Sequence, residues 1–164
     1  MSTSSFFISS LPIGCAATLL FDVWLVILRR FGLRTLDFAL LGRWAAHAAH
    51  GRFVHASIAD AAPVHSERAL GWSVHYAVGI VFAGLLIVFA GPAWLQAPTI
   101  APALSFGLAS VAAPLLITQP AMGAGLLASK TPKPLANCLR SLINHAVFGI
   151  GLYLAAAVLA RIGA

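Results

Sequence analysis

Charged residues are scarce in this sequence, and acidic ones most of all. Of its 164 residues only 9% are charged and four are acidic, whereas 60% are hydrophobic. A soluble globular domain carries more polar side chains than this to cover its surface. Together with a mean hydropathy of +0.94, this scarcity excludes an ordinary soluble domain and predicts an integral membrane protein.

Several chemical signatures are also missing. The two cysteines, Cys15 and Cys138, form no CxxC pair, and we expect them near opposite membrane faces, too far apart for a disulfide. The sequence has no nucleotide-binding glycine loop, no GxSxG motif and no HExxH motif. These absences favour a protein that is not an enzyme, and no cofactor is evident.

The sequence does hold four long apolar segments, at about residues 6–28, 69–90, 100–127 and 141–159. A helix needs about 20 apolar residues to cross about 30 Å of hydrocarbon, and these segments approach or exceed that length. The first has no basic residue ahead of it, so we predict a retained helix rather than a cleaved signal peptide. The pattern predicts an all-α, polytopic protein in which residues 1–164 form a single membrane domain.

Basic residues lie almost entirely on one side of the predicted spans. Three of them lie in residues 128–140, Arg161 alone lies on the opposite side, and the loop of residues 29–68 holds Arg29, Arg30, Arg34, Arg43, Arg52 and Arg68. Because Lys and Arg are retained in the cytoplasm during insertion, both loops are predicted to be cytoplasmic and both termini periplasmic. The net charge of +6 then indicates topology and contact with lipid rather than nucleic-acid binding.

The first loop is too apolar for a solvated linker, and its Leu36–His50 stretch has helical periodicity. At 100° per residue Arg43, His47 and His50 share one narrow face, while apolar residues share another. This pattern is typical of an amphipathic helix lying at the membrane surface, and Gly51 is placed to end it. The rest of the loop is predicted to be irregular.

Histidines crowd this loop and raise the alternative of a metal site. The candidate ligands are His47, His50, His55 and His65. A closed divalent-metal site requires at least one of the later histidines, or an acid, to fold back onto the helix. An interfacial enzyme, dependent on lipid or metal, would instead need His47, His50 and His65 to converge with Asp60 or Glu67.

Polar side chains inside the spans are costly and therefore candidates for function. Asp22, His75, Gln119 and His145 each lie in a different predicted span. Asp22, His75 and His145 are placed about 6 to 9 Å from the cytoplasmic end, and Gln119 near the same level, so the four are predicted to form one polar layer. The layer is either structural, as hydrogen bonds between helices, or functional, as a proton relay or cation site.

Two further patterns concern the spans themselves. The hexapeptides HYAVGI, from His75, and HAVFGI, from His145, indicate a weak internal repeat of the kind seen in some transporters. In the third span Pro114 and Pro120 each remove a backbone donor, which predicts a kinked or broken helix. A kinked packing helix and a ligand-binding break both fit this pattern.

The succession DVWLVILRRFG, GRWAAHAAHGRFVH, ERALGWSVHYAVGI, PLLITQPAMGAGLLASKTPKP and HAVFGIGLYLA resembles a bacterial inner-membrane family known as domain of unknown function 2938. The resemblance runs from about Gly14 to Ala157. It implies a four-helix integral membrane protein of the inner membrane. It implies no activity, and no site residue is carried over.

Three functions are compatible with these observations. The first is a small transport or permeation protein, as a homo-oligomer if four helices enclose too little space, with the polar layer as its site. The second is a membrane-embedded accessory or assembly subunit with a partner membrane protein. The third is the interfacial enzyme. The lipid bilayer is the expected partner in each case, and nucleic acid is not.

Overall fold

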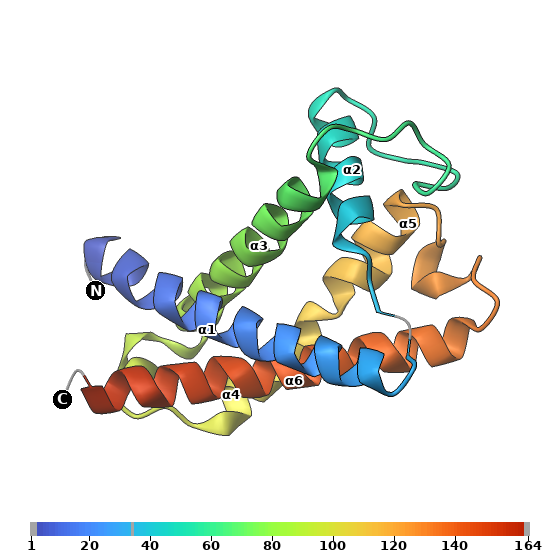
Figure 1. The fold of residues 1–164 in the computed structure, drawn as a ribbon. Helices are drawn as coiled ribbons and strands as arrows, with labels where there is room; N and C mark the ends of the chain where they lie inside the picture. Colours follow the sequence, from blue (N-terminus) through green and yellow to red (C-terminus); the bar gives the residue numbers. More distant parts are fainter. Residues whose placement is uncertain (1–2, 34, 163–164) are drawn as a thin grey trace. The chain divides into compact units, whose positions relative to one another are not determined.

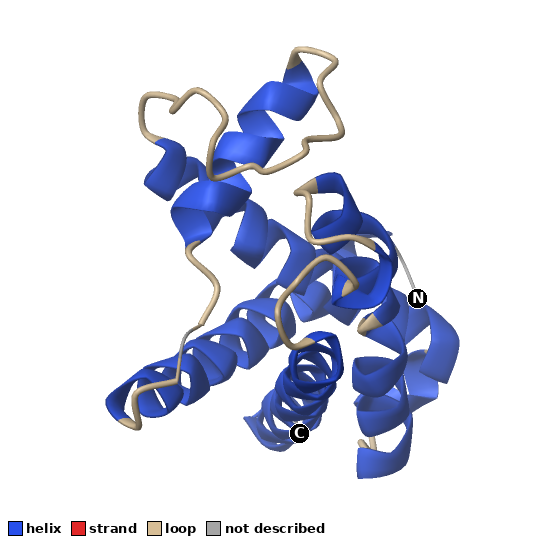
Figure 2. Ribbon diagram, turned by 90° about the vertical axis from the view of Figure 1, so that its right-hand side faces the viewer, coloured by secondary structure: helices blue, strands red, loops and turns tan. Residues whose placement is uncertain are grey.

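A computed structural model describes residues 3–33 and 35–162, and every regular element in these ranges is helical (Figures 1 and 2). Arg34, one of the basic residues used to predict topology, lies outside the described residues. The elements are α1 (Thr3–Arg30), α2 (Phe38–Ala49), α3 (Glu67–Ala90), η1 (Pro92–Leu95), α4 (Ile100–Ser110), η2 (Ala113–Thr118), α5 (Gln119–Ala121), η3 (Leu126–Ala128) and α6 (Pro134–Ile162). The all-α prediction is confirmed.

Four stretches of helix are long and apolar enough to cross a membrane: Ile8–Arg30, Glu67–Ala90, Ile100–Ala121 and Pro134–Ile162. They coincide with the four segments predicted from the sequence, with two differences at the ends. The third stretch ends at Ala121 instead of near 127, and α6 begins at Pro134 instead of near 141. Proline suits the first turn of a helix because the N–H that it lacks would have no helical partner there.

Helix α2 forms within the first loop, where a helix was predicted. The side chain of Asp37 accepts a hydrogen bond from Ala39 N–H at 2.9 Å and so caps its first turn. Gly51 follows the last turn with φ +81°, a conformation that glycine adopts without steric cost. Residues 51–66 then contain no helix or strand.

Contacts group the chain into two compact units, each built from separated segments. Unit 1 comprises Met1–Thr35, Tyr76–Ser110 and Asn144–Ala164, and unit 2 comprises Leu36–His75 and Val111–Ile143. Helices α3 and α6 each contribute residues to both units. Each unit is described by itself below.

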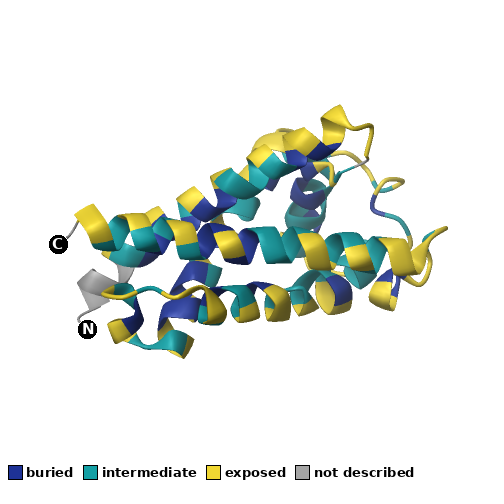
Figure 3. Ribbon diagram, turned by 90° about the horizontal axis from the view of Figure 1, so that it is seen from below, coloured by how far each residue is buried: buried dark blue, intermediate teal, exposed yellow. Residues whose placement is uncertain are grey.

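Unit 1 contains the hydrophobic core. Its buried side chains are Ile13, Ala17, Ala83, Leu86, Ile87, Trp94, Ala103, Phe148, Leu152 and Ala156. Exposed positions recur along the long helices (yellow in Figure 3), and many of them carry large apolar side chains. Apolar outer faces of this kind suit a lipid environment rather than water.

Small residues allow the helices of unit 1 to approach closely. A methyl group added at Gly107 of α4 would lie 2.6 Å from Gly149 Cα of α6, and one added at Gly149 would lie 2.8 Å from Ala103 O. On α3, Gly79 meets Thr18 of α1 in the same way. Each approach brings backbone against backbone or side chain, as in the small-residue crossings of membrane helices.

Two of the three glycines at these crossings, Gly79 and Gly149, belong to the repeated hexapeptides. Gly79 ends HYAVG on α3 and contacts α1, whereas Gly149 ends HAVFG on α6 and contacts α4. The same sequence pattern therefore marks the crossing point of two helix pairs, α1–α3 and α4–α6. This equivalence gives the weak repeat in the sequence a structural counterpart.

The crossing predicts a strong effect of bulk at Gly107. In Gly107→Val the added side chain must displace the α6 backbone, which we expect to destabilise the protein by about 1–3 kcal/mol or more. Ala109→Val, on an exposed position of the same helix, is the matched control and should be nearly neutral. Thermal loss of helical circular dichroism in detergent measures both, and equal melting temperatures for the two variants would contradict the packing described here.

Candidate functional site

Hydrogen bonds between side chains join the helices of unit 1, among them the following three in the described part of the chain. Tyr76 Oη of α3 donates to Asp22 Oδ2 of α1 at 3.0 Å, and Trp24 Nε1 of α1 donates to Asn144 Oδ1 of α6 at 2.9 Å. Between α4 and α6, Ser110 Oγ lies 2.8 Å from His145 Nδ1. All three are partly buried, so each side chain gains a partner that lipid could not supply.

Sequence reasoning identified Asp22 and His145 but missed their partners, Tyr76 and Ser110, and it missed the Trp24–Asn144 pair. Tyr76 and Asn144 are each next to a residue that was singled out, His75 and His145 respectively. A signal was therefore present, since polar neighbours on a helix lie at similar heights. Tyrosine, tryptophan and serine occur so often in apolar helices that their presence alone indicates no site.

The third span changes helix type where the two prolines lie. The regular helix α4 ends at Ser110, and a π-helical segment, η2, runs from Ala113 to Thr118. The short helix α5 (Gln119–Ala121) follows, and Gly123 after it has φ +101°, a backbone conformation that is not helical. We call residues 111–125 the span break.

Gln119 lies at the centre of the span break, and only one of the two polar atoms of its side-chain amide has a hydrogen-bond partner among the described residues. Its Nε2 donates to Ser141 Oγ at 3.2 Å. Its Oε1 is buried and has no hydrogen-bond partner among the described residues. An amide oxygen that is buried without a donor costs free energy, so this position is a candidate for binding a donor group.

The fourth residue of the predicted polar layer, His75, packs among aromatic rings. Its ring centroid lies 4.4 Å from that of Phe38 and 5.8 Å from that of Trp72. The hydrogen bonds named above join Asp22, Gln119 and His145 to residues outside the predicted set, and the four residues are divided between the two units. A common layer stays a prediction.

Arg43 of α2 is the hub of unit 2. Its Nε and Nη2 donate to the two carboxylate oxygens of Glu67 at 2.8 and 2.9 Å. Its Nη1 lies 2.9 Å from Ala59 O, 3.0 Å from Ala61 O and 3.3 Å from Ile58 O. The hydrogen bond to Glu67 raises the pKa of Arg43 above its usual range. The guanidinium therefore stays charged and holds the loop of residues 51–66 against α2.

His47, one turn beyond Arg43, pairs with His55 of the same loop. Its Nδ1 lies 2.9 Å from His55 Nε2, and its Nε2 lies 3.0 Å from Ala62 O. A carbonyl oxygen only accepts, so His47 Nε2 must carry a proton. Both rings are buried, and His55 Nδ1 has no partner in the described part of the chain.

The remaining loop histidines do not join this pair. His50 Nδ1 lies 2.8 Å from Ala46 O of its own helix, and His65 is exposed. Across residues 3–33 and 35–162 no three His, Cys, Asp or Glu side chains are grouped so that they could hold a metal ion. The face of α2 that was predicted to meet lipid headgroups thus directs Arg43 and His47 into the protein's own loop.

The loop also caps the span break. His55 N–H donates to Ala121 O at 2.8 Å, and Ile58 N–H donates to Met122 O at 3.0 Å. A methyl group added at Gly123 would lie 2.7 Å from the carbonyl carbon of Ala56. Carbonyls at the end of a helix need partners when they are buried, and here the loop supplies them.

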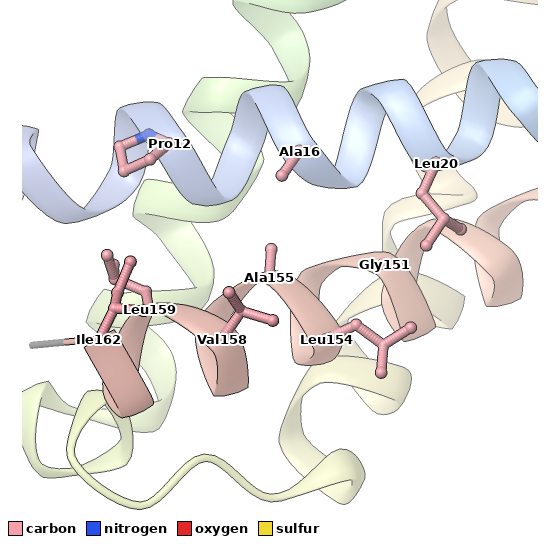
Figure 4. Close-up of a pocket in the computed structure, with 9 residues that line it drawn as sticks. All are labelled: Pro12, Ala16, Leu20, Gly151, Leu154, Ala155, Val158, Leu159 and Ile162. Atoms are coloured by element: carbon pink, nitrogen blue, oxygen red, sulfur yellow. The ribbon is translucent and has the colours of Figure 1, made fainter.

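Figure 4 shows an apolar groove between α1 and α6, in unit 1. Its volume is about 320 Å³, and it is lined by Pro12, Ala16, Leu20, Gly151, Leu154, Ala155, Val158, Leu159 and Ile162. No side chain in this lining carries a polar group, so it offers no chemistry beyond contact with hydrocarbon.

The described part of the chain is a helical protein with four helices long and apolar enough to cross a membrane and with hydrogen bonds between them, which is compatible with an integral membrane protein. The chain belongs to the family described as "Protein of unknown function (DUF2938)", whose model matches residues 11–159. The resemblance seen in the sequence is confirmed. No curated protein and no solved structure matches the chain.

The hub predicts that Arg43→Lys loosens the loop even though the charge is kept. Lysine cannot bridge both carboxylate oxygens and the loop carbonyls at once, so amides of residues 51–66 should exchange with deuterium about tenfold faster or more. Arg52→Lys, at an exposed position of the same loop, is the control. Equal exchange in both variants, measured by mass spectrometry in detergent, would remove Arg43 as the organiser of the loop.

Proposed function

We propose that this protein is a small transport or permeation protein of the bacterial inner membrane. Its four apolar helices span the bilayer, both termini are periplasmic, and the loops before α3 and before α6 are cytoplasmic. The four long apolar helices and their exposed apolar side chains support insertion in a membrane. The orientation rests on the distribution of lysine and arginine.

The observation that carries the proposal is the unpartnered Oε1 of Gln119 in the span break. Broken helices at membrane depth are tolerated where they line a cavity or a ligand path, and they form the binding sites of many transporters. The π-helical turn just before Gln119 adds to this, because such turns occur frequently at functional sites. The Ser141 hydroxyl, bonded to the same amide, supplies a second polar group.

The polar groups of the spans also restrict the solute. The break offers an acceptor at Gln119 and a hydroxyl at Ser141, and neither is charged. The apolar segments contain one carboxylate, Asp22, and no Lys or Arg between their ends. A small neutral or monocationic solute that donates hydrogen bonds, such as water, a polyol, an amide or an ammonium ion, fits this set better than an anion.

A second candidate is the membrane-embedded accessory subunit, which another observation favours. Asp22 and His145 each have a hydrogen-bond partner on a neighbouring helix of unit 1. Polar pairs of this kind stabilise helix association without moving a solute. On this alternative the protein acts by holding a partner protein in the membrane.

Solute flux in reconstituted vesicles tests the proposal. Purified protein is placed in liposomes, and shrinkage or internal pH is followed by stopped flow for water, glycerol, urea and methylammonium. We expect at least one of these to cross faster than in empty liposomes. Gln119→Met should slow that flux by a factor of about 5 to 150, the range given by leaving a buried donor of the solute without a partner.

Gln96→Met is the matched control, because Gln96 is the other glutamine and lies exposed after η1. It should leave the flux unchanged. No flux above empty liposomes for the whole panel, with protein shown to be inserted, overturns the proposal. Equal flux in wild type and Gln119→Met would show that the solute does not pass the span break.

The accessory alternative makes a different prediction. Purification in a gentle detergent from the native membrane should then recover a second membrane protein at fixed stoichiometry. Tyr76→Phe and Ser110→Ala each remove a hydrogen bond between helices of this chain, which should destabilise its fold by about 0.6 to 2 kcal/mol. Recovery of the second protein should fall as a result. A monodisperse assembly of this chain alone would count against an accessory role.

A further inference from the structure

We infer that the loop of residues 51–66 is a proton-sensitive latch on the span break, with the buried His47–His55 pair as its sensor. The inference rests on the proposed function only for what opening of the latch would control, namely access to Gln119. The latch itself is built from contacts within unit 2. Its parts are the imidazole pair, the Arg43 hub, and the two backbone bonds from the loop to Ala121 and Met122.

Hydrogen bonding fixes the protons of the neutral pair. His47 Nε2 donates to Ala62 O, so in the neutral ring Nδ1 is the acceptor. His55 Nε2 must then be the donor across the 2.9 Å contact. Of the four ring nitrogens in this pair, His55 Nδ1 alone has no hydrogen bond among the described residues, and it holds a lone pair in a buried position.

A third proton cannot be accommodated without cost. While the contact is kept, its two nitrogens share one proton and His47 Nε2 holds another, so the added proton must reside on His55 Nδ1. That position would become a buried N–H donor with no acceptor, and the buried pair of rings would carry one positive charge. A fourth proton would place two N–H groups face to face. Protonation is thus relieved by separating the rings and exposing them to water.

The surrounding charges do not remove this cost. Glu67 on α3 lies near enough to interact with His47, but both of its oxygens are engaged by Arg43 of α2. The short helix α5 has no titratable residue. The other titratable groups on α2 and the loop are His50, which is turned to Ala46 O, and the exposed Arg52, Asp60 and His65.

Separation of the rings releases the cap on the span break. His55 is at once the sensor and the donor to Ala121 O, and Ile58 three residues later donates to Met122 O. Moving His55 to solvent therefore breaks the bond that covers the last turn after Gln119. Because histidine is the side chain whose charge changes between about pH 5 and 8, acidification on the loop side is the trigger.

The test is hydrogen exchange of the intact protein in detergent, expressed as protection factors so that the intrinsic effect of pH on exchange is removed. Peptides covering residues 51–66 and 119–125 should lose about tenfold or more of their protection between about pH 7.5 and about pH 5.5. Peptides from the core of unit 1 should not change over this range.

His55→Gln separates the sensor from the fold. A glutamine amide can turn to donate to His47 Nδ1 or to accept from it, so the pair tolerates both states of His47. We expect protection of the loop to become independent of pH in this variant. His50→Gln and His65→Gln are the matched controls and should keep the wild-type response.

Loop protection that does not depend on pH in the wild-type protein overturns the latch without requiring any variant to fold. A response lost in His50→Gln or His65→Gln but kept in His55→Gln overturns it as well. The vesicle assay fails or succeeds separately. If the loop opens with falling pH but no solute crosses the vesicle membrane, the latch is supported and transport is rejected. If a solute crosses but protection of the loop does not depend on pH, transport is supported and the latch is rejected.

Discussion

Every polar group buried in this protein must find its partner within the chain, and the rest of the structure follows from that constraint. In apolar surroundings an unpaired N–H or carbonyl has no water to bond. The interhelical pairs Asp22–Tyr76, Trp24–Asn144 and His145–Ser110 meet this demand with side chains. The loop of residues 51–66 meets it with backbone, by capping carbonyls where the third span ends.

The same constraint makes the exceptions informative. Gln119 Oε1 and His55 Nδ1 are buried without partners among the described residues, and both lie in unit 2. The first lies in the span break and the second in the loop that caps this break. Thr18 Oγ1, also unpartnered, lies instead against Gly79 at a helix crossing, where close packing is reason enough for its position. The two units therefore differ: unit 1 is a packed hydrophobic core of long helices, whereas unit 2 contains the Arg43–Glu67 ion pair, the His47–His55 pair and the span break.

Much of the fold was accessible from the sequence because apolar length and charge distribution act locally. The four spans, the helix from Phe38 and its end at Gly51 follow from hydropathy, periodicity and capping. The boundaries at Ala121 and Pro134 differed from expectation because apolar residues continue past the last helical hydrogen bond of the third span and polar residues open α6. Hydropathy gives the length of the apolar segment, whereas a helix ends where its backbone groups bond outside the helix.

The candidate site was accessible only in part. The sequence alone determined which residues are out of place in apolar helices, namely Asp22, His75, Gln119 and His145, because transfer cost depends on the side chain itself. Only the tertiary structure decided the partners: that Arg43 and His47 turn into the loop, that His55 completes a pair, and that Gln119 keeps a free oxygen. Those outcomes depend on contacts between segments far apart in the chain, and periodicity within one segment carries no information about them.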